Sequence, residues 1–159
     1  QGMAVSIPVI EYAKEIHASE QTLYRALVLA NLVSIYQKVF IGKLSAYCGA
    51  VSAAAGAVSG IAWLDGESEE IIKKTIINTI CTVGGMVCDG AKPSCASKVA
   101  AALGTAILSL EMAKRGSAFS VGEGLVMDTA ENTIKSIGRM ASQGMENTDN
   151  IILQIMLGN

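Results

Sequence analysis

The sequence predicts an all-α protein, a compact bundle of about seven helices around a central helix rich in alanine and glycine. Apolar residues recur three and four positions apart along most of the chain, and no segment shows the alternation of a half-buried strand. Aromatic residues make up only 4% of the composition and there are only two prolines, whereas a sandwich or barrel would have more aromatic and turn residues. The 159 residues are enough to bury one core and no linker interrupts them, so we expect a single domain over residues 1–159.

The first two helices are predicted at residues 5–16 and 20–40. Pro8 is compatible with the first helix only in its first turn, where an N–H group would be unpaired in any case. Ser19 is a suitable N-cap for the second helix, and Gly42 is expected to end it.

The central helix is predicted within residues 44–64, a stretch of 21 residues without a charge. This length would cross a bilayer, and Gly56-x-x-x-Gly60 is a close-approach motif that membrane helices also use. Thirteen of the 21 residues are Ala, Gly or Ser, however, and neither an aromatic belt nor a basic flank marks a membrane interface. We therefore expect a buried helix wrapped by its neighbours, and no membrane partner.

Two longer helices follow, separated by a loop at residues 88–93. The carboxylates of Glu69 and Glu70 fit the first turn of a helix that ends at residues 84–85, because they complement the helix dipole. Pro93 is expected at the start of the next helix, which runs through residue 113 and is closed by Gly116.

The last two helices are shorter. Asp128 is predicted to cap a helix that extends to about residue 142. Either Thr148 or Asp149 is predicted to cap a final helix that ends at residue 157.

The charge balance argues against nucleic acid as a partner. Twelve basic residues stand against 14 acidic ones, and no run of Lys and Arg marks a nucleic-acid-binding surface. No signal-peptide pattern is visible, so we expect a cytoplasmic protein.

The four cysteines carry the main chemical signal. Without a secretory signal, metal binding or catalysis is a more common use of cysteine than a disulfide, and the paired spacing of a zinc ribbon is absent. Cys88 and Cys95 flank a glycine-containing loop between two helices, which suits a cluster held by few thiolates. Cys81 lies in mid-helix, where we expect it only to pack, and spacing leaves both roles open for Cys48.

Four segments of the chain carry a family resemblance. Residues 85–99 read GMVCDGAKPSCASKV and are similar to the signature of the UPF0597 family. Residues 48–51, 144–149 and 1–8 are similar to its preceding helix, its C-terminal motif and an internal segment. The family is related to L-cysteine desulfidase and to the alpha chain of iron–sulfur L-serine dehydratase, and its members are much longer. The resemblance therefore implies that the chain is the C-terminal part of a longer serine dehydratase alpha-like protein.

The resemblance also implies a cofactor and a reaction. Cys48, Cys88 and Cys95 would hold an oxygen-sensitive [4Fe–4S] cluster, with one iron left open as a Lewis acid. The implied activity is a lyase reaction that eliminates sulfide from L-cysteine, or water from L-serine, and yields pyruvate and ammonia. We expect the full-length protein to prefer L-cysteine, and the present chain alone to be inactive and to lack the cluster.

Further site residues are predicted from the same loop and the helix after it. Asp89 and Lys92 are the candidate catalytic residues, with Lys92 placed to bind the substrate carboxylate; alternatively, Asp89 caps a turn and Lys92 is solvated. Gly90, Ser94 and Lys98 are candidate substrate-binding residues, although Lys98 could equally pair with a neighbouring carboxylate.

Two questions remain open in the sequence. The base that removes the Cα proton lies either in this loop or upstream of residue 1. The alternative function is a non-catalytic helical scaffold whose cysteines only pack, and the sequence allows a homo-oligomer in either case.

Overall fold

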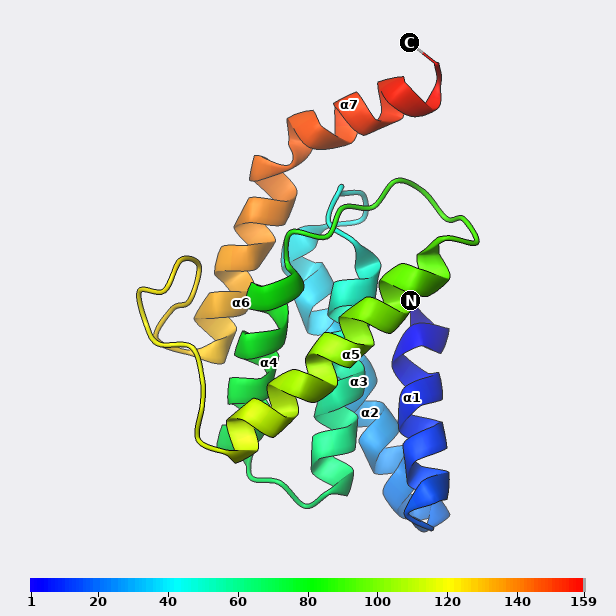
Figure 1. The fold of residues 1–159 in the computed structure, drawn as a ribbon, viewed down its shortest axis with the longest axis vertical. Helices are drawn as coiled ribbons and strands as arrows, with labels where there is room; N and C mark the ends of the chain where they lie inside the picture. The colour runs from blue at the N-terminus through cyan, green and yellow to red at the C-terminus, as the bar shows by residue number, and fades with distance from the viewer. Residues whose placement is uncertain (159) are drawn as a thin grey trace.

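The computed structural model describes residues 1–158 and confirms the all-α fold. In this described part of the chain, seven α-helices form a bundle from which the last one projects (Figure 1). They are α1 (Gly2–Glu15), α2 (Glu20–Ile41), α3 (Gly49–Leu64), α4 (Glu69–Val83), α5 (Cys95–Lys114), α6 (Ala130–Arg139) and α7 (Glu146–Met156), with a π-helical turn at Met140–Gly144. Over residues 1–158 the only β-type pairing is one isolated bridge.

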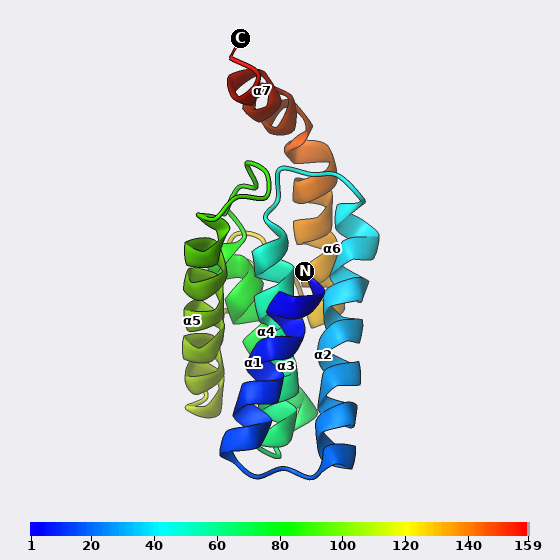
Figure 2. The ribbon, with the colours of Figure 1, turned by 90° about the vertical axis from the view of Figure 1, so that its right-hand side faces the viewer.

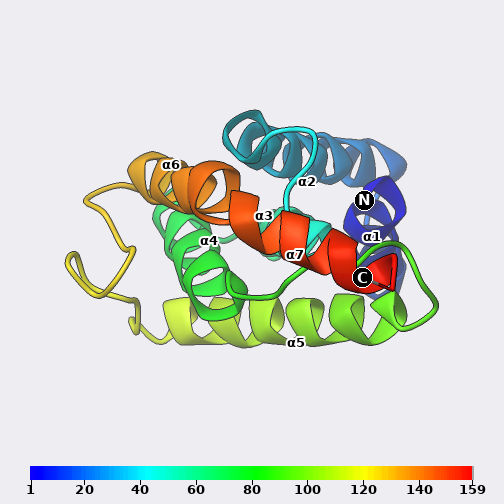
Figure 3. The same cartoon turned by 90° about the horizontal axis from the view of Figure 1, so that it is seen from above.

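The central helix is α3, as predicted. It lies between α1, α2, α4 and α5, and Figure 3 shows it enclosed when the bundle is seen from above. Every residue from 51 to 62 is buried. A Cβ atom added at Gly56 would lie 2.4 Å from the carbonyl oxygen of Ala30, so the missing side chain lets α2 approach α3 closely.

The start of α1 differs from the prediction. The helix begins at Gly2, not near residue 5, and Pro8 therefore lies in its second turn. Pro8 has no N–H to donate, so the helix loses one backbone hydrogen bond there. Val5 and Val9 are 1% and 0% exposed, and their burial offsets that loss.

Side-chain caps determine where three helices begin. The Ser19 and Ser68 hydroxyls accept hydrogen bonds from the backbone N–H groups of Thr22 and Ile71, which confirms the predicted starts of α2 and α4. The prediction for α6 was wrong by one residue. Thr129 caps it, its hydroxyl accepting from the Asn132 N–H at 3.0 Å.

Three other boundaries also differ from the prediction. The α-helix of α6 ends at Arg139 because the chain continues as a π turn, in which the Met145 N–H donates to the Met140 carbonyl at 3.0 Å. Helix α7 then begins at Glu146, before Thr148 and Asp149, and has no side-chain cap. Helix α5 begins at Cys95, two residues after Pro93, because residues 93–94 form a turn.

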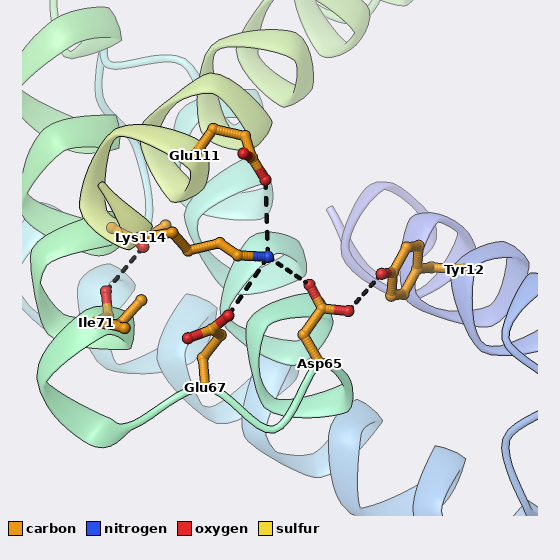
Figure 4. Close-up of polar contacts among 7 residues, drawn as sticks. Tyr12, Asp65, Glu67, Ile71, Glu111 and Lys114 are labelled. Atoms are coloured by element: carbon orange, nitrogen blue, oxygen red, sulfur yellow. Dashed lines mark hydrogen bonds and ion pairs between the residues drawn. The ribbon is translucent and has the colours of Figure 1, made fainter. Parts of the chain in front are cut away.

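A charged network ties α1 and α5 to the loop between α3 and α4, at the end of the bundle where α3 and α5 finish (Figure 4). Lys114 Nζ lies 3.4 Å from carboxylate oxygens of Asp65 and Glu67, and 3.7 Å from Glu111. The Tyr12 hydroxyl donates to the other oxygen of Asp65. This network lies at the opposite end of α3 from Cys48, so the two ends of the bundle have different chemistry.

Among residues 1–158, one helix, α5, is long and apolar enough to cross a membrane, judged by length and composition alone. A single helix of this kind is weak evidence, because core helices of proteins that cross no membrane meet the same criteria.

Candidate functional site

A short backbone bridge joins the two segments that carry Cys48 and Cys88. Tyr47 and Val87 form an isolated antiparallel bridge. The Cys48 N–H donates to the Met86 carbonyl at 3.0 Å, and the Cys88 N–H donates to the Ala46 carbonyl at 2.6 Å. The start of α3 is thereby fixed beside the segment that follows α4, although 40 residues separate the two cysteines.

The loop after Cys88 folds back on Cys95, the first residue of α5. The Cys95 thiol donates to the Gly90 carbonyl at 3.4 Å and accepts from the Lys92 N–H at 3.5 Å. Gly90 has a φ of 90°, in the left-handed region that favours glycine. A Cβ there would also lie 3.0 Å from Cε of Met156, so α7 approaches the loop at this point.

The three cysteines named by the resemblance line one cavity of about 200 Å³. It opens between α1, the start of α3, the loop and the first turn of α5. Its lining consists of Gln1, Ala4, Cys48, Gly49, Ala50, Cys88, Gly90, Ala91, Cys95, Lys98 and Val99. Cys81 is not among these residues and lines a separate pocket with Phe119 and Leu125, and burial raises the pKa of its thiol to about 11.

Lys98 is the cation of this cavity. Its ammonium group donates to Asp89 Oδ1 at 2.5 Å and to the Val87 carbonyl at 3.0 Å. The hydrogen bond from Lys98 lowers the pKa of Asp89, and the same bond raises the pKa of Lys98. The pair therefore carries both charges at neutral pH, and Lys98 is held in place by the loop.

The structure brings together only some of the predicted site residues. Gly90 and Lys98 line the cavity with the three cysteines, and Asp89 contacts it through Lys98. Lys92 and Ser94 are exposed and lie outside the lining. The pairing of Lys98 with a carboxylate, which the sequence left as an alternative, is present.

Sequence reasoning missed the contribution of α1. Gln1 and Ala4 form one wall of the cavity, and the Gln1 amide donates to the Ser34 hydroxyl of α2 at 2.6 Å. Nothing in the sequence signals this wall, because it depends on how α1 packs against α3. Val99, by contrast, follows Cys95 by four residues, so helical spacing could have placed it on the same face.

The surroundings of Cys48 shift the pKa of its thiol. Burial raises the pKa of Cys48, the neighbouring Cys88 and Cys95 raise it further, and the Lys98 charge acts in the opposite direction. Within residues 1–158, no group of three or more His, Cys, Asp or Glu side chains is placed to hold a metal ion. An iron–sulfur cluster takes each thiolate on a different iron, so three thiols around one cavity fit it in kind and number.

Comparison with known proteins gives a family match over nearly the whole chain. Residues 1–154 match the family model described as serine dehydratase alpha chain. The chain is 51% identical over 157 residues to a UPF0597 protein of Treponema denticola, and 52% identical over 157 residues to one of Lachnoclostridium phytofermentans. A UPF0597 protein of Bacteroides fragilis is 43% identical over 156 residues.

These matches cover 98–99% of the present chain but only 36–38% of each relative. The chain thus spans less than two-fifths of the length of the relatives that it matches. No solved structure matches it significantly.

Proposed function

Given that the chain belongs to the serine dehydratase alpha chain family, we propose that it is the cluster-binding part of an iron–sulfur lyase that acts on L-cysteine. The reaction would convert L-cysteine and water into pyruvate, ammonia and sulfide; with L-serine, water would leave in place of sulfide. One observation carries the proposal: Cys48, Cys88 and Cys95 share a cavity with the fixed ammonium group of Lys98.

The three thiols define where the cofactor would bind. When bound, a [4Fe–4S] cluster held by Cys48, Cys88 and Cys95 would supply a Lewis-acidic iron for the leaving sulfur or oxygen. Gly90 lies in the loop beside these thiols, and its missing side chain lets Met156 of α7 approach the loop.

Lys98 is the residue that would bind the substrate carboxylate. Its ammonium group lines the cavity, whereas Lys92 does not, so we assign carboxylate binding to Lys98. Asp89 keeps its negative charge and holds Lys98 by a hydrogen bond, which makes it a positioning residue. No histidine or carboxylate is among the lining residues found within residues 1–158, so we propose that the base comes from the part of the full-length protein outside this chain.

The test is anaerobic reconstitution of the full-length protein with iron and sulfide. We expect broad visible absorption and formation of pyruvate from L-cysteine, with sulfide released in equal amount. Activity measured with L-serine as the alternative substrate identifies which of the two the enzyme prefers.

Cysteine variants provide the matched controls. Cys48→Ser, Cys88→Ser and Cys95→Ser should each lose most of the bound iron, whereas Cys81→Ser should retain it. If a folded, reconstituted full-length protein binds no iron and forms no pyruvate, a helical scaffold with packed cysteines is the better description.

A further inference from the structure

Helix α2 is apolar on two opposite faces. Its inward face packs on the core through Ala26, Ala30 and Ile41, which are at most 2% exposed. Its outer face, defined here as Val28, Leu32, Ile35 and Val39, repeats at intervals of four, three and four residues. These four side chains are 58–69% exposed.

The outer face lies along the side of the bundle. Figures 2 and 3 show α2 as an outermost helix, with no other segment on the side away from α3. Two tyrosines border the face, Tyr24 at 56% and Tyr36 at 38% exposure. A helix that is hydrophobic all round is normally buried inside a larger protein, and contiguous exposed apolar patches mark interaction surfaces.

The length of the relatives indicates what could cover this face. More than three-fifths of each relative lies outside the region that this chain matches. Helix α7, which projects beyond the end of the bundle in Figure 2, also has no buried residue, and Ile155 and Leu157 at its end are 69% and 67% exposed. A symmetric contact with a second copy would cover either the outer face of α2 or helix α7. The remainder of the polypeptide, which in these relatives is longer than the matched region, can cover both.

We propose that the outer face of α2 is an internal interface, covered in the full-length protein by the part of the same polypeptide that lies outside residues 1–159. The interface is of the obligate kind, because its centre consists of large aliphatic side chains without a charge. The proposal does not depend on the lyase activity, and it concerns a face of α2 other than the one that packs on α3.

Oxidative footprinting of the full-length protein tests the proposal. Hydroxyl radicals modify exposed side chains, and mass spectrometry locates the modification on Val28, Leu32, Ile35 and Tyr36. We expect these residues to react at least tenfold more slowly than in the same protein denatured, at every protein concentration tested. Reaction near the denatured rate overturns the proposal. Protection that appears only at high protein concentration also overturns it, in favour of a second copy, as does protection only on lipid vesicles, in favour of a membrane.

A pair of variants provides an independent measurement. Leu32→Lys should lower the Tm of the full-length protein by several degrees, because it places a charge in the proposed interface. Gln21→Lys adds the same charge at the exposed N-terminal end of α2, where only the helix dipole opposes it, and should lower the Tm clearly less than Leu32→Lys does. Equal effects of the two variants would contradict the proposal, and the footprint decides the case if Leu32→Lys fails to fold. Neither residue belongs to the cysteine cavity, so iron binding and pyruvate formation test the proposed function separately.

Discussion

Lys92 and Lys98 carry the same charge six residues apart, but their surroundings differ. Lys92 is exposed in the loop, whereas Lys98 lies one helical turn after Cys95 and is fixed by Asp89 and a backbone carbonyl. A cation that is already held in place binds a carboxylate without a further loss of side-chain entropy.

Lys98→Met should therefore weaken substrate binding in the reconstituted full-length protein. The lost charge-assisted hydrogen bond is worth about 1.5–3 kcal/mol, which corresponds to a rise in KM of about tenfold or more. Lys92→Met is the matched control and should change KM by less than about twofold. Steady-state kinetics with L-cysteine measures both, and a larger effect of Lys92→Met would contradict the assignment.

The Tyr12 hydroxyl makes the free energy of unfolding depend on pH in the alkaline range. The hydrogen bond to Asp65 raises the pKa of the Tyr12 hydroxyl, and partial burial raises it further. A raised folded pKa means that the stabilisation is complete below the unfolded value of about 10 and is lost as pH rises through the folded value.

Tyr12→Phe should lower the free energy of unfolding by about 1 kcal/mol at pH 8. The difference between wild type and variant should shrink as pH rises above 10, because the wild type loses its advantage there. Urea unfolding from pH 8 to 11 measures this, and a constant difference over that range would contradict it.

At the scale of helices, close contact between α2 and α3 depends on glycine. The Cβ of an alanine at position 56 would lie 2.4 Å from a backbone oxygen, so the two helices would have to separate. At Gly104, on α5, a Cβ would have no neighbour within 4 Å. The two glycines look alike in the sequence, and only their packing distinguishes them.

Gly56→Ala should destabilise the protein by about 1–3 kcal/mol or more, through overpacking. Gly104→Ala should stabilise it by about 0.5–1 kcal/mol, because alanine is the better helix former. Thermal and urea unfolding of both variants provide the comparison, and changes of the same sign would show that the contact is not tight.

The helix starts also differ in whether a local side-chain cap or tertiary packing sets them. Where a serine side chain caps the first turn, as at Ser19 and Ser68, local chemistry sets the start and the sequence predicts it. Helices α1 and α7 start without a side-chain cap, and both predictions missed the start by a few residues. In α1, Val5 and Val9 are buried against other helices, and this tertiary burial cannot be predicted from capping residues and helix propensity.

At the scale of the whole molecule, the cysteine cavity depends on four separate segments. Helix α1 supplies one wall, the start of α3 supplies Cys48, and the loop and α5 supply the other two thiols. A ligand that binds all three thiols would link these segments and stabilise the folded state.

Loading the full-length protein with iron and sulfide under anaerobic conditions should therefore raise its Tm by several degrees. Removal of the iron with a chelator should reverse the gain. Cys48→Ser should abolish it and Cys81→Ser should preserve it. A Tm that is independent of iron, in protein shown to contain it, would mean that the cluster does not connect these segments.

The sequence by itself determined the helical class, most helix positions and the buried character of α3, because these follow from local periodicity, capping and the absence of charge. The cysteine spacing, read with the family resemblance, named the three thiols that the fold brings to one cavity. Only the tertiary structure decided that Lys98, and not Lys92, faces that cavity, that α1 closes one side of it, and that the outer face of α2 is left uncovered. These features depend on contacts between segments far apart in the chain, and the packing of several helices at once determines which contacts form.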